Sequence, residues 1–378
     1  MSIYFDNAAT TKPFEECNRA VLRALNEKWG NPSSLHKMGI EAQEVAENSR
    51  KAIAAALGCE SECVYFTSGA TESNNTAILG AAKAHGKRRK KIVTTSVEHP
   101  SVSEAMKLLE ANGYEIVRVN ARSDGEYCFE DFIDAVDDNT CLVSCMLVNN
   151  ENGLIMPVKK AFNSIKRLYP HIITHTDAVQ GFLKIPFKAS ELNADLISIS
   201  AHKIHGPKGV GALYIKKDVR ISPHIIGGGQ ENKKRSGTEN IPAIAGFGAA
   251  VRVNMANANE NAAKAQELKS ALFRSLMRLD GVSFNSGTED SSPYIANFSV
   301  MGVRSEIMLH YLEEKEIFVS SGSACSKGAK SSVLKGFGLS DDRIDSALRV
   351  SFCAENTVGE VKVLCAAIAD GIARFRKQ

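Results

Sequence analysis

A single lysine, Lys203, follows a run of apolar and small residues at 196–200, where that run meets a loop rich in Gly and Pro. The pattern of Leu196, Ile197 and Ile199 predicts a short strand that is buried on both faces. Ligands of open α/β sheets bind beyond the carboxyl ends of the strands, so this strand would deliver the lysine to a ligand site. An amine there can act as a nucleophile and form a Schiff base with an aldehyde cofactor. The alternative for a lone lysine after a strand is an ordinary solvated surface residue.

Polar residues follow three more predicted strands, which span 64–66, 141–148 and 172–176. Residues 68–71, Ser-Gly-Ala-Thr, open a helix whose free N–H groups suit a phosphate, with the Thr71 hydroxyl as a further donor. Residues 149–153 follow the second strand, and Asp177 follows the third. A buried Asp needs a cationic partner, and the N–H of a pyridinium ring would serve. Four coincident strand ends therefore favour one cofactor site.

Each of these residues also has a structural explanation when it is taken alone. Asp177 could cap a helix, His202 could be a hydrogen-bonded core histidine, and Asn150 could belong to a turn. In the functional interpretation, Ser200 and His202 add donors to the same phosphate while Lys203 holds the aldehyde.

Strands and helices alternate along the first two thirds of the chain. Strands are expected at 64–66, 92–95, 115–119, 141–148, 172–176, 196–200 and 211–215. Helices are expected at 15–28, 39–57, 100–112, 130–137 and 161–169, with one more that ends near His85. This alternation predicts an α/β fold with a mostly parallel sheet covered by helices on both faces.

The last third of the chain reads as a smaller α+β domain. A long helix is expected at 257–279, after a change of composition near Val253 that suits a domain boundary. Further helices at 305–315 and after Thr357, and a strand at 318–320, complete this part. The predicted domains are 15–253 for the larger one, and 1–14 with 254–378 for the smaller one and an extended N-terminal arm.

Composition excludes several classes of protein. The chain has 378 residues, 44% hydrophobic and 24% charged, with a formal net charge of +3, which is typical of a soluble globular protein. That charge is too small to indicate nucleic acid or a membrane as the main partner. The first residues lack the pattern of a secretory signal, and nine scattered Cys suit a reducing compartment, so we expect a cytoplasmic protein. No Cys or His group has the spacing of a metal site.

The motifs, taken in order along nearly the whole chain, resemble those of the pyridoxal-phosphate-dependent cysteine desulfurases, the NifS/IscS-like group of the class V aminotransferases. The motifs that carry this resemblance are YFDNAATT at 4–11, GNPSS at 30–34 with His36, FTSGATESNN at 66–75, EH at 98–99, VNNE at 148–151, DAVQ at 177–180, HKIHGPKG at 202–209, RSGT at 235–238 and SSGSAC at 320–325. The resemblance implies fold type I, like aspartate aminotransferase, with pyridoxal 5'-phosphate as cofactor and L-cysteine as substrate.

The resemblance also implies roles around the ring of the cofactor. Lys203 would bind the cofactor covalently, Asp177 would pair with the pyridine nitrogen, and His99 would stack on the ring. Gln180 would reach the ring hydroxyl, and Asn150 would lie near that hydroxyl and the substrate carboxylate.

Further implied roles concern the phosphate and the substrate. The residues that would hold the phosphate are Ala70, Thr71, Ser200 and His202. Thr238 would reach the phosphate of the partner subunit's cofactor, which makes the active form a homodimer. Arg349 would bind the substrate carboxylate bidentately, a geometry that suits a guanidinium.

Cys325 is the residue that would distinguish a desulfurase from an aminotransferase. It lies in the small and polar stretch SSGSACSKG, near Lys327 and Lys330, which would favour the thiolate. The resemblance implies that Cys325 takes sulfur from L-cysteine as a persulfide, with His99 as a proton donor. An acceptor protein, such as an iron–sulfur scaffold or a tRNA-thiolation enzyme, would then receive the sulfur. The structural alternative is one ordinary thiol among nine.

Two departures from the family and two rival functions complete the prediction. Ala201 stands where the family usually has Gly, and the segment FCAEN at 352–356 replaces a Gly-Arg pair after the substrate arginine. Another class V enzyme, an aminotransferase or a selenocysteine lyase, would keep Lys203 and Asp177 but would not need Cys325. A non-catalytic scaffold dimer would need none of these residues.

Overall fold

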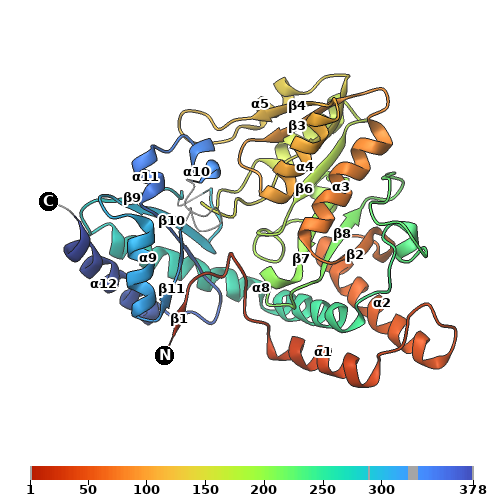
Figure 1. Cartoon of the computed structure of the whole chain (residues 1–378), viewed down its shortest axis with the longest axis horizontal. Coiled ribbons are helices and arrows are strands. Elements are labelled where there is room, and N and C mark those ends of the chain that lie inside the picture. Colours follow the sequence, from red (N-terminus) through yellow and green to blue (C-terminus); the bar gives the residue numbers. More distant parts are fainter. Residues whose placement is uncertain (1, 288–289, 322–330, 377–378) are drawn as a thin grey trace.

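The computed structural model describes residues 2–287, 290–321 and 331–376. A seven-stranded sheet forms the larger part (Figure 1), in the order β2-β8-β7-β6-β5-β3-β4. Its strands are β2 (Val64–Thr67), β3 (Lys91–Thr95), β4 (Glu115–Val119), β5 (Thr140–Ser144), β6 (Ile173–Asp177), β7 (Leu196–Ser200) and β8 (Gly211–Ile215). Strands β4, β3, β5, β6 and β7 pair in parallel, whereas β8 is antiparallel to both of its neighbours. The predicted mostly parallel sheet is confirmed.

Helices cover both faces of this sheet. The helices of this part of the chain that precede the last strand of the sheet are α1 (Glu15–Glu27), α2 (Lys37–Leu57), α3 (Ala70–His85), α4 (Pro100–Ala111), α5 (Phe129–Ala135), α6 (Val158–Leu168) and α7 (Ala189–Leu192). Alternate strand residues enter different cores: Leu196 packs with α3 and α4, and Ile197 packs with helices of the opposite face. All five residues of β7 are buried, which explains its continuous run of apolar and small residues.

A second, antiparallel sheet has the order β12-β13-β10-β9. Its strands are β9 (Val282–Phe284), β10 (Ile295–Val300), β12 (Ser320–Ser321) and β13 (Ala347–Ser351). The helices of this part are α9 (Ser305–Glu314), α10 (Ser332–Gly336), α11 (Asp341–Asp345) and α12 (Val358–Phe375). The N-terminal arm joins it, because β1 (Ile3–Tyr4) pairs in parallel with β11 (Ile317–Phe318). The strand expected at 318–320 is thus two short strands that pair with different partners.

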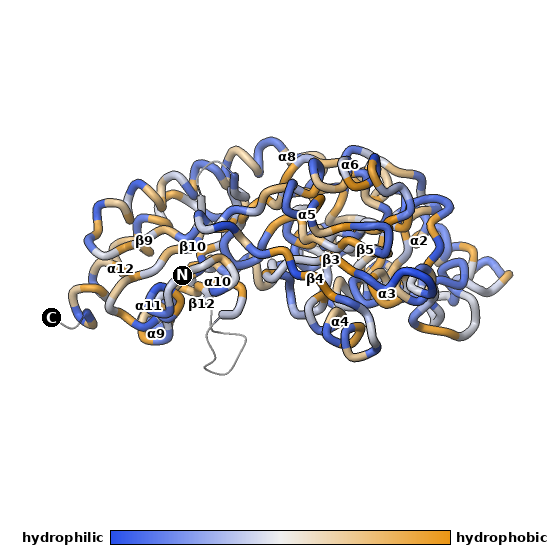
Figure 2. Tube along the Cα trace, turned by 90° about the horizontal axis from the view of Figure 1, so that it is seen from above, coloured by the Kyte–Doolittle hydropathy of each residue, from blue (hydrophilic) through white to orange (hydrophobic). Residues whose placement is uncertain are grey.

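Helix α8 (Ile241–Leu276) is 36 residues long, and it begins well before the helix expected at 257–279. Figure 2 shows it along one side of the molecule, past both sheets. Phe247 on its first half packs in the core of the larger sheet, and Leu272 on its second half packs in the other core. The change of composition near Val253 therefore falls inside one helix. The domain limits at 253 and 254 stay a prediction.

Two glycines explain why the sequence did not predict the first part of α8. Gly246 and Gly248 lower the helix propensity of this stretch, but both lie at close contacts. A Cβ at Gly246 would collide with Pro207, and a Cβ at Gly248 would collide with Ser49 on α2. The tertiary packing selects glycine here in spite of its propensity. None of the described helices is both long and apolar enough to cross a bilayer.

Candidate active site

A cavity of about 640 Å³ opens at the carboxyl ends of the central strands. Its walls come from the N-terminal arm, the turns after β2, β6 and β7, the start of α4, and Arg349 on β13. Ten of the residues predicted for the site line it: Ala70, Thr71, His99, Asn150, Asp177, Gln180, Ser200, His202, Lys203 and Arg349. Residues that are up to 279 positions apart thus meet because parallel strand ends converge on one edge.

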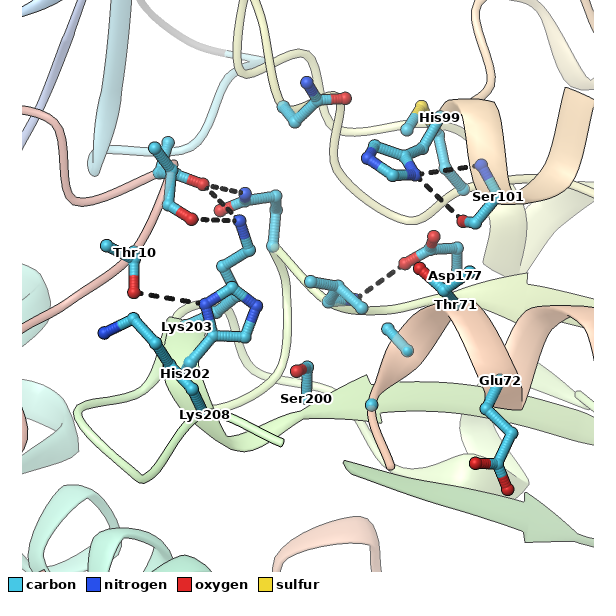
Figure 3. A pocket seen from close by; sticks show the side chains of 18 of the residues that line it. Thr10, Thr71, Glu72, His99, Ser101, Asp177, Ser200, His202, Lys203 and Lys208 are labelled. Atoms are coloured by element: carbon cyan, nitrogen blue, oxygen red, sulfur yellow. Dashed lines mark hydrogen bonds between the residues drawn. The ribbon is translucent and has the colours of Figure 1, made fainter. Parts of the chain in front are cut away.

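Lys203 ends a short 3₁₀ turn (Ala201–Lys203) that follows directly after β7. Its Nζ donates hydrogen bonds to the carbonyl oxygens of Ala8 and Ala9, both at 2.7 Å. These carbonyls belong to the N-terminal arm, which thereby holds the amine at the cavity wall. Figure 3 shows Lys203, His202 and Thr10 together on one side of the cavity, facing Asp177 and His99 on the other.

Asp177 is the last residue of β6, and it is only 6% exposed. Its Oδ2 accepts a hydrogen bond from Asn74 Nδ2 at 2.7 Å, and its Oδ1 accepts one from the Val179 N–H at 3.0 Å. Within the described part of the chain, no ion pair joins this carboxylate to a Lys, Arg or His. A buried carboxylate with neutral partners fits a cationic ring N–H in the cavity.

His99 caps the N-terminus of α4, and its ring opens onto the cavity. Its Nδ1 lies 2.9 Å from Ser101 Oγ and accepts the Ser101 N–H at 3.1 Å. Burial lowers the pKa of His99, and the charge of Lys203 acts in the same direction against the opposing charge of Asp177. The lowered pKa favours the neutral form of the ring.

The turn after β2 forms the floor on which a phosphate would rest. Gly69 has φ +152°, a conformation that favours glycine, and α3 begins at the next residue. A Cβ on Gly211 would lie 2.8 Å from Gly69 Cα, so β8 can approach this turn only without a side chain. Free N–H groups of the first turn of α3 thus face the cavity beside Thr71.

His202 completes this wall. Its Nδ1 lies 3.2 Å from Thr10 Oγ1. Burial, with the nearby charges of Lys203, Lys208 and Lys184, lowers the pKa of His202 to about 4. The imidazole is therefore neutral at pH 7, and it can donate one hydrogen bond to an anion without a formal charge.

Arg349 and Asn150 form the opposite rim of the cavity. The Arg349 Nη2 donates to Asp6 Oδ1 at 2.8 Å, and its Nη1 donates to the Asn150 carbonyl at 2.9 Å. Arg349 Nε and Asn150 Oδ1 are buried and have no hydrogen-bond partner among the described residues. Such orphaned polar atoms suit a ligand that carries both acceptors and donors.

Among the described residues, Thr238 is the one predicted site residue that does not line this cavity. Thr238 is exposed and lines a separate hollow of about 140 Å³, which shares Ser68 and Gly209 with the larger cavity. Cys325, with its neighbours Lys327 and Lys330, lies outside the described residues.

Sequence reasoning missed four residues that bond to the predicted site: Asp6, Asn74, Ser101 and Lys184. Asp6 and Asn74 stand inside motifs that the sequence singled out, but nothing in those motifs indicates their partners. Lys184 donates from Nζ to Gln180 Oε1 at 3.2 Å. Burial and the nearby charge of Lys203 lower the pKa of Lys184 to about 7.

Comparison with known proteins identifies the family of the chain. The model of the family described as Aminotransferase class-V matches residues 3–364. The chain belongs to the class V aminotransferase family. A NifS/IcsS protein homolog from Lactobacillus delbrueckii subsp. bulgaricus is 40% identical over 379 aligned residues, which cover 99% of this chain and 98% of that protein.

Two further relatives agree with this membership in the class V aminotransferase family. Cysteine desulfurase IscS of Methanosarcina thermophila is 36% identical over 377 aligned residues, which cover 99% of this chain and 93% of that protein. A solved structure described as a NifS-like protein is 37% identical and superposes with a TM-score of 0.94, covering 99% of this chain and all of the other. The mixed α/β architecture of this chain is thus that of fold type I class V enzymes.

Proposed function

We propose that this chain is a pyridoxal-phosphate-dependent cysteine desulfurase, which converts L-cysteine to L-alanine and passes the sulfur to Cys325. The observation that carries the proposal is the meeting of Lys203, Asp177 and His99 around one cavity, with Arg349 on its rim. The named desulfurases among the relatives support the choice of substrate.

The residues of the cavity fit the cofactor. Lys203 supplies the amine that attaches its aldehyde, and the buried carboxylate of Asp177 supplies the partner for its ring nitrogen. The turn at Gly69, with Thr71 and His202, suits its phosphate. When bound, pyridoxal phosphate supplies an electron sink for negative charge on the α-carbon of an amino acid.

The substrate would bind between the two rims of the cavity. Arg349 would bind the substrate carboxylate, for which its unpartnered Nε is a spare donor. The unpartnered Asn150 Oδ1 can only accept, so it suits an N–H or O–H group of the ligand. Lys203 Nζ would take the α-proton of the bound amino acid as a general base.

Sulfur transfer is assigned to Cys325. Its thiolate attacks the sulfur of the bound cysteine, so that an S–S bond forms and the Cβ–S bond breaks. The electron pair of the broken bond stays on the carbon side, and protonation there gives the methyl group of alanine. His99 would supply this proton from Nε2 after the ring has taken up a proton as an imidazolium, and it would return to the neutral ring whose Nδ1 accepts the Ser101 N–H. The Cys325 persulfide then serves a sulfur-acceptor protein.

The test is a joint assay of alanine and sulfide from L-cysteine. Cys325→Ser should still bind the cofactor and should lose nearly all alanine formation. Cys353→Ser is the matched control, because this thiol lies outside the wall of the main cavity and should be dispensable for sulfur transfer. Alanine release at the wild-type rate by Cys325→Ser would refute the desulfurase mechanism and favour another class V reaction.

A further inference from the structure

A chain of three hydrogen bonds links Asp177 to His99 through two residues that have no assigned role. Asn74 Nδ2 donates to Asp177 Oδ2 at 2.7 Å and to Ser101 Oγ at 2.8 Å. Ser101 Oγ lies 2.9 Å from His99 Nδ1. Asn74 is fully buried, and Ser101 is 8% exposed. Figure 3 shows the end of this chain, where two dashed lines join Ser101 to His99 beside Asp177.

The chemistry of the partners fixes the direction of every bond in this chain. An ionised carboxylate only accepts, so Asn74 must turn its NH₂ group toward Asp177. The second hydrogen of that NH₂ group points at Ser101 Oγ, which therefore accepts. The single hydroxyl hydrogen of Ser101 is then left for His99 Nδ1, which must accept it.

The backbone supports the same direction independently. The Ser101 N–H also donates to His99 Nδ1, at 3.1 Å. An N–H group cannot accept a hydrogen bond. A proton on Nδ1 would therefore point at the Ser101 N–H, which can only donate, and at the Ser101 hydroxyl, whose oxygen already accepts from Asn74. Both donors thus favour the neutral ring with its proton on Nε2, the nitrogen that stays available to the cavity.

We infer that Asn74 and Ser101 are positioning residues, which hold His99 in the neutral Nε2–H tautomer and couple that tautomer to the carboxylate of Asp177. The role deepens the proposed desulfurase function, on which its catalytic meaning rests. In that reaction Nε2 of His99 would be the nitrogen that takes up a proton and gives it back, and the same chain orients the Asp177 carboxylate that would serve the ring nitrogen of the cofactor. One hydrogen-bonded path thereby orients both Asp177 and His99, which line the same cavity.

The charged groups that face His99 come from two elements. They are Asp177 at the end of β6, which favours the protonated ring, and Lys203 after β7, which disfavours it. Glu98, the neighbour in sequence, points away and accepts from Thr95 Oγ1 and the Met146 N–H. Removing the Ser101 hydroxyl leaves Asp177 and Lys203 in place, so a change in His99 would report the lost hydrogen bond.

The test is nuclear magnetic resonance of the full-length holoenzyme with ¹⁵N-labelled histidine imidazoles, assigned with His99→Gln. In the wild type, His99 should carry its proton on Nε2 at pH 7. In Ser101→Ala the tautomer should persist, because the backbone N–H remains, but the pKa of His99 should rise by about 0.5 to 1 unit, the worth of one hydrogen bond. Asn74→Ala should raise it less, and Ser101→Thr should restore the wild-type value.

Ser103→Ala, on the same helix α4, is the matched control and should leave His99 unchanged. A wild-type ring with its proton on Nδ1, or an unchanged pKa in both Ser101→Ala and Asn74→Ala, would overturn the inference. These measurements need no turnover, so an inactive enzyme would refute the proposed function without touching this result.

Discussion

Arg349 on β13 donates from Nη2 to Asp6 Oδ1 at 2.8 Å, so the proposed substrate arginine shares an ion pair with the N-terminal arm. The guanidinium side chain is 11% exposed, and that of Asp6 is 22% exposed. The arm thus orients the arginine, but it also places a second carboxylate beside the one that the substrate would bring.

Asp6→Asn should separate these two effects. The amide oxygen can still accept from Arg349, whereas the negative charge that competes with the substrate is removed. We expect the KM for L-cysteine to fall about two- to fivefold, since a charge at this range contributes of the order of 1 kcal/mol in a partly solvated site. Alanine formation as a function of L-cysteine concentration measures it.

Two variants bracket this prediction. Arg349→Lys cannot bind a carboxylate bidentately, and it should raise the KM about 10- to 100-fold. Asp345→Asn alters a more exposed carboxylate, paired with Arg304, and should change nothing. An unchanged KM in both Asp6→Asn and Arg349→Lys would remove this ion pair from substrate binding.

Three lysines lie near the proposed cofactor site, and we expect only one of them to bind pyridoxal phosphate covalently. Lys203 and Lys208 line the large cavity, whereas Lys184 and Lys203 meet in a separate hollow of about 30 Å³. Burial lowers the pKa of Lys184, so its amine could also react with an aldehyde, but its Nζ donates a hydrogen bond to Gln180. After borohydride reduction of the holoenzyme, peptide mass spectrometry should find pyridoxal phosphate on Lys203 alone. Label on Lys184 or Lys208 in the wild type would contradict the assignment.

The sequence predicted the residues at the cavity because their positions follow from a general rule. Strand ends of a parallel sheet share one edge, so Asp177 after β6 and Lys203 after β7 had to lie near each other. The same rule says nothing about residues that bond sideways. Ser101 is the second residue of α4, and its link to Asp177 runs through Asn74 on α3, so it depends on how α3 and α4 pack against each other.

The N-terminal arm shows a second limit of prediction. Asp6 reaches Arg349 because β1 pairs with β11, a contact between segments more than 300 residues apart. Two-residue strands carry no periodicity from which that pairing could be predicted. The long helix α8 was hidden for a related reason, since Gly246 and Gly248 are chosen for close contacts with other elements.

Glu98 should make the stability of the fold depend on pH. It is 4% exposed, its Oε2 has no hydrogen-bond partner among the described residues, and burial raises its pKa to about 8. Between its unfolded value near 4.5 and about 8, the folded state holds a proton that the unfolded state has lost. The contribution of Glu98 is therefore fully present below pH 4.5 and is lost as the pH rises toward 8.

Glu98→Gln imitates the protonated acid at every pH. The wild type loses the contribution of Glu98 as the pH rises, whereas the variant does not. The free energy of unfolding of the variant minus that of the wild type should therefore increase by about 2 kcal/mol from pH 5 to pH 7. Urea unfolding at a fixed protein concentration measures the difference. Glu104→Gln, an exposed carboxylate paired with Lys107, should show no such trend. Parallel pH profiles of the wild type and Glu98→Gln would show that Glu98 is ionised in the folded protein.

Thr238 should act on the cofactor of the partner subunit. The loop that carries Thr238 also contains Arg235, whose Nε donates to Glu72 Oε1 of the same chain at 2.9 Å. Glu72 lies beside the turn at Gly69, where we expect the phosphate to bind. Thr238 itself is exposed, and it lies outside the wall of its own large cavity. An exposed residue next to a phosphate turn is well placed to serve a second site if two chains join there. We therefore expect two composite sites in a homodimer.

Subunit mixing tests this arrangement. Lys203→Ala and Thr238→Ala, each inactive alone, should form heterodimers in which one site keeps both a native lysine and a native threonine. Random exchange of equal amounts should restore about a quarter of the wild-type activity, because half of the dimers are mixed and each has one intact site. The pair Lys203→Ala and Asp177→Ala is the control, since both residues line the same cavity of one chain and no mixture can restore a site. Subunit exchange is first verified by mass spectrometry. If neither mixture then regains activity, each site is built from one chain.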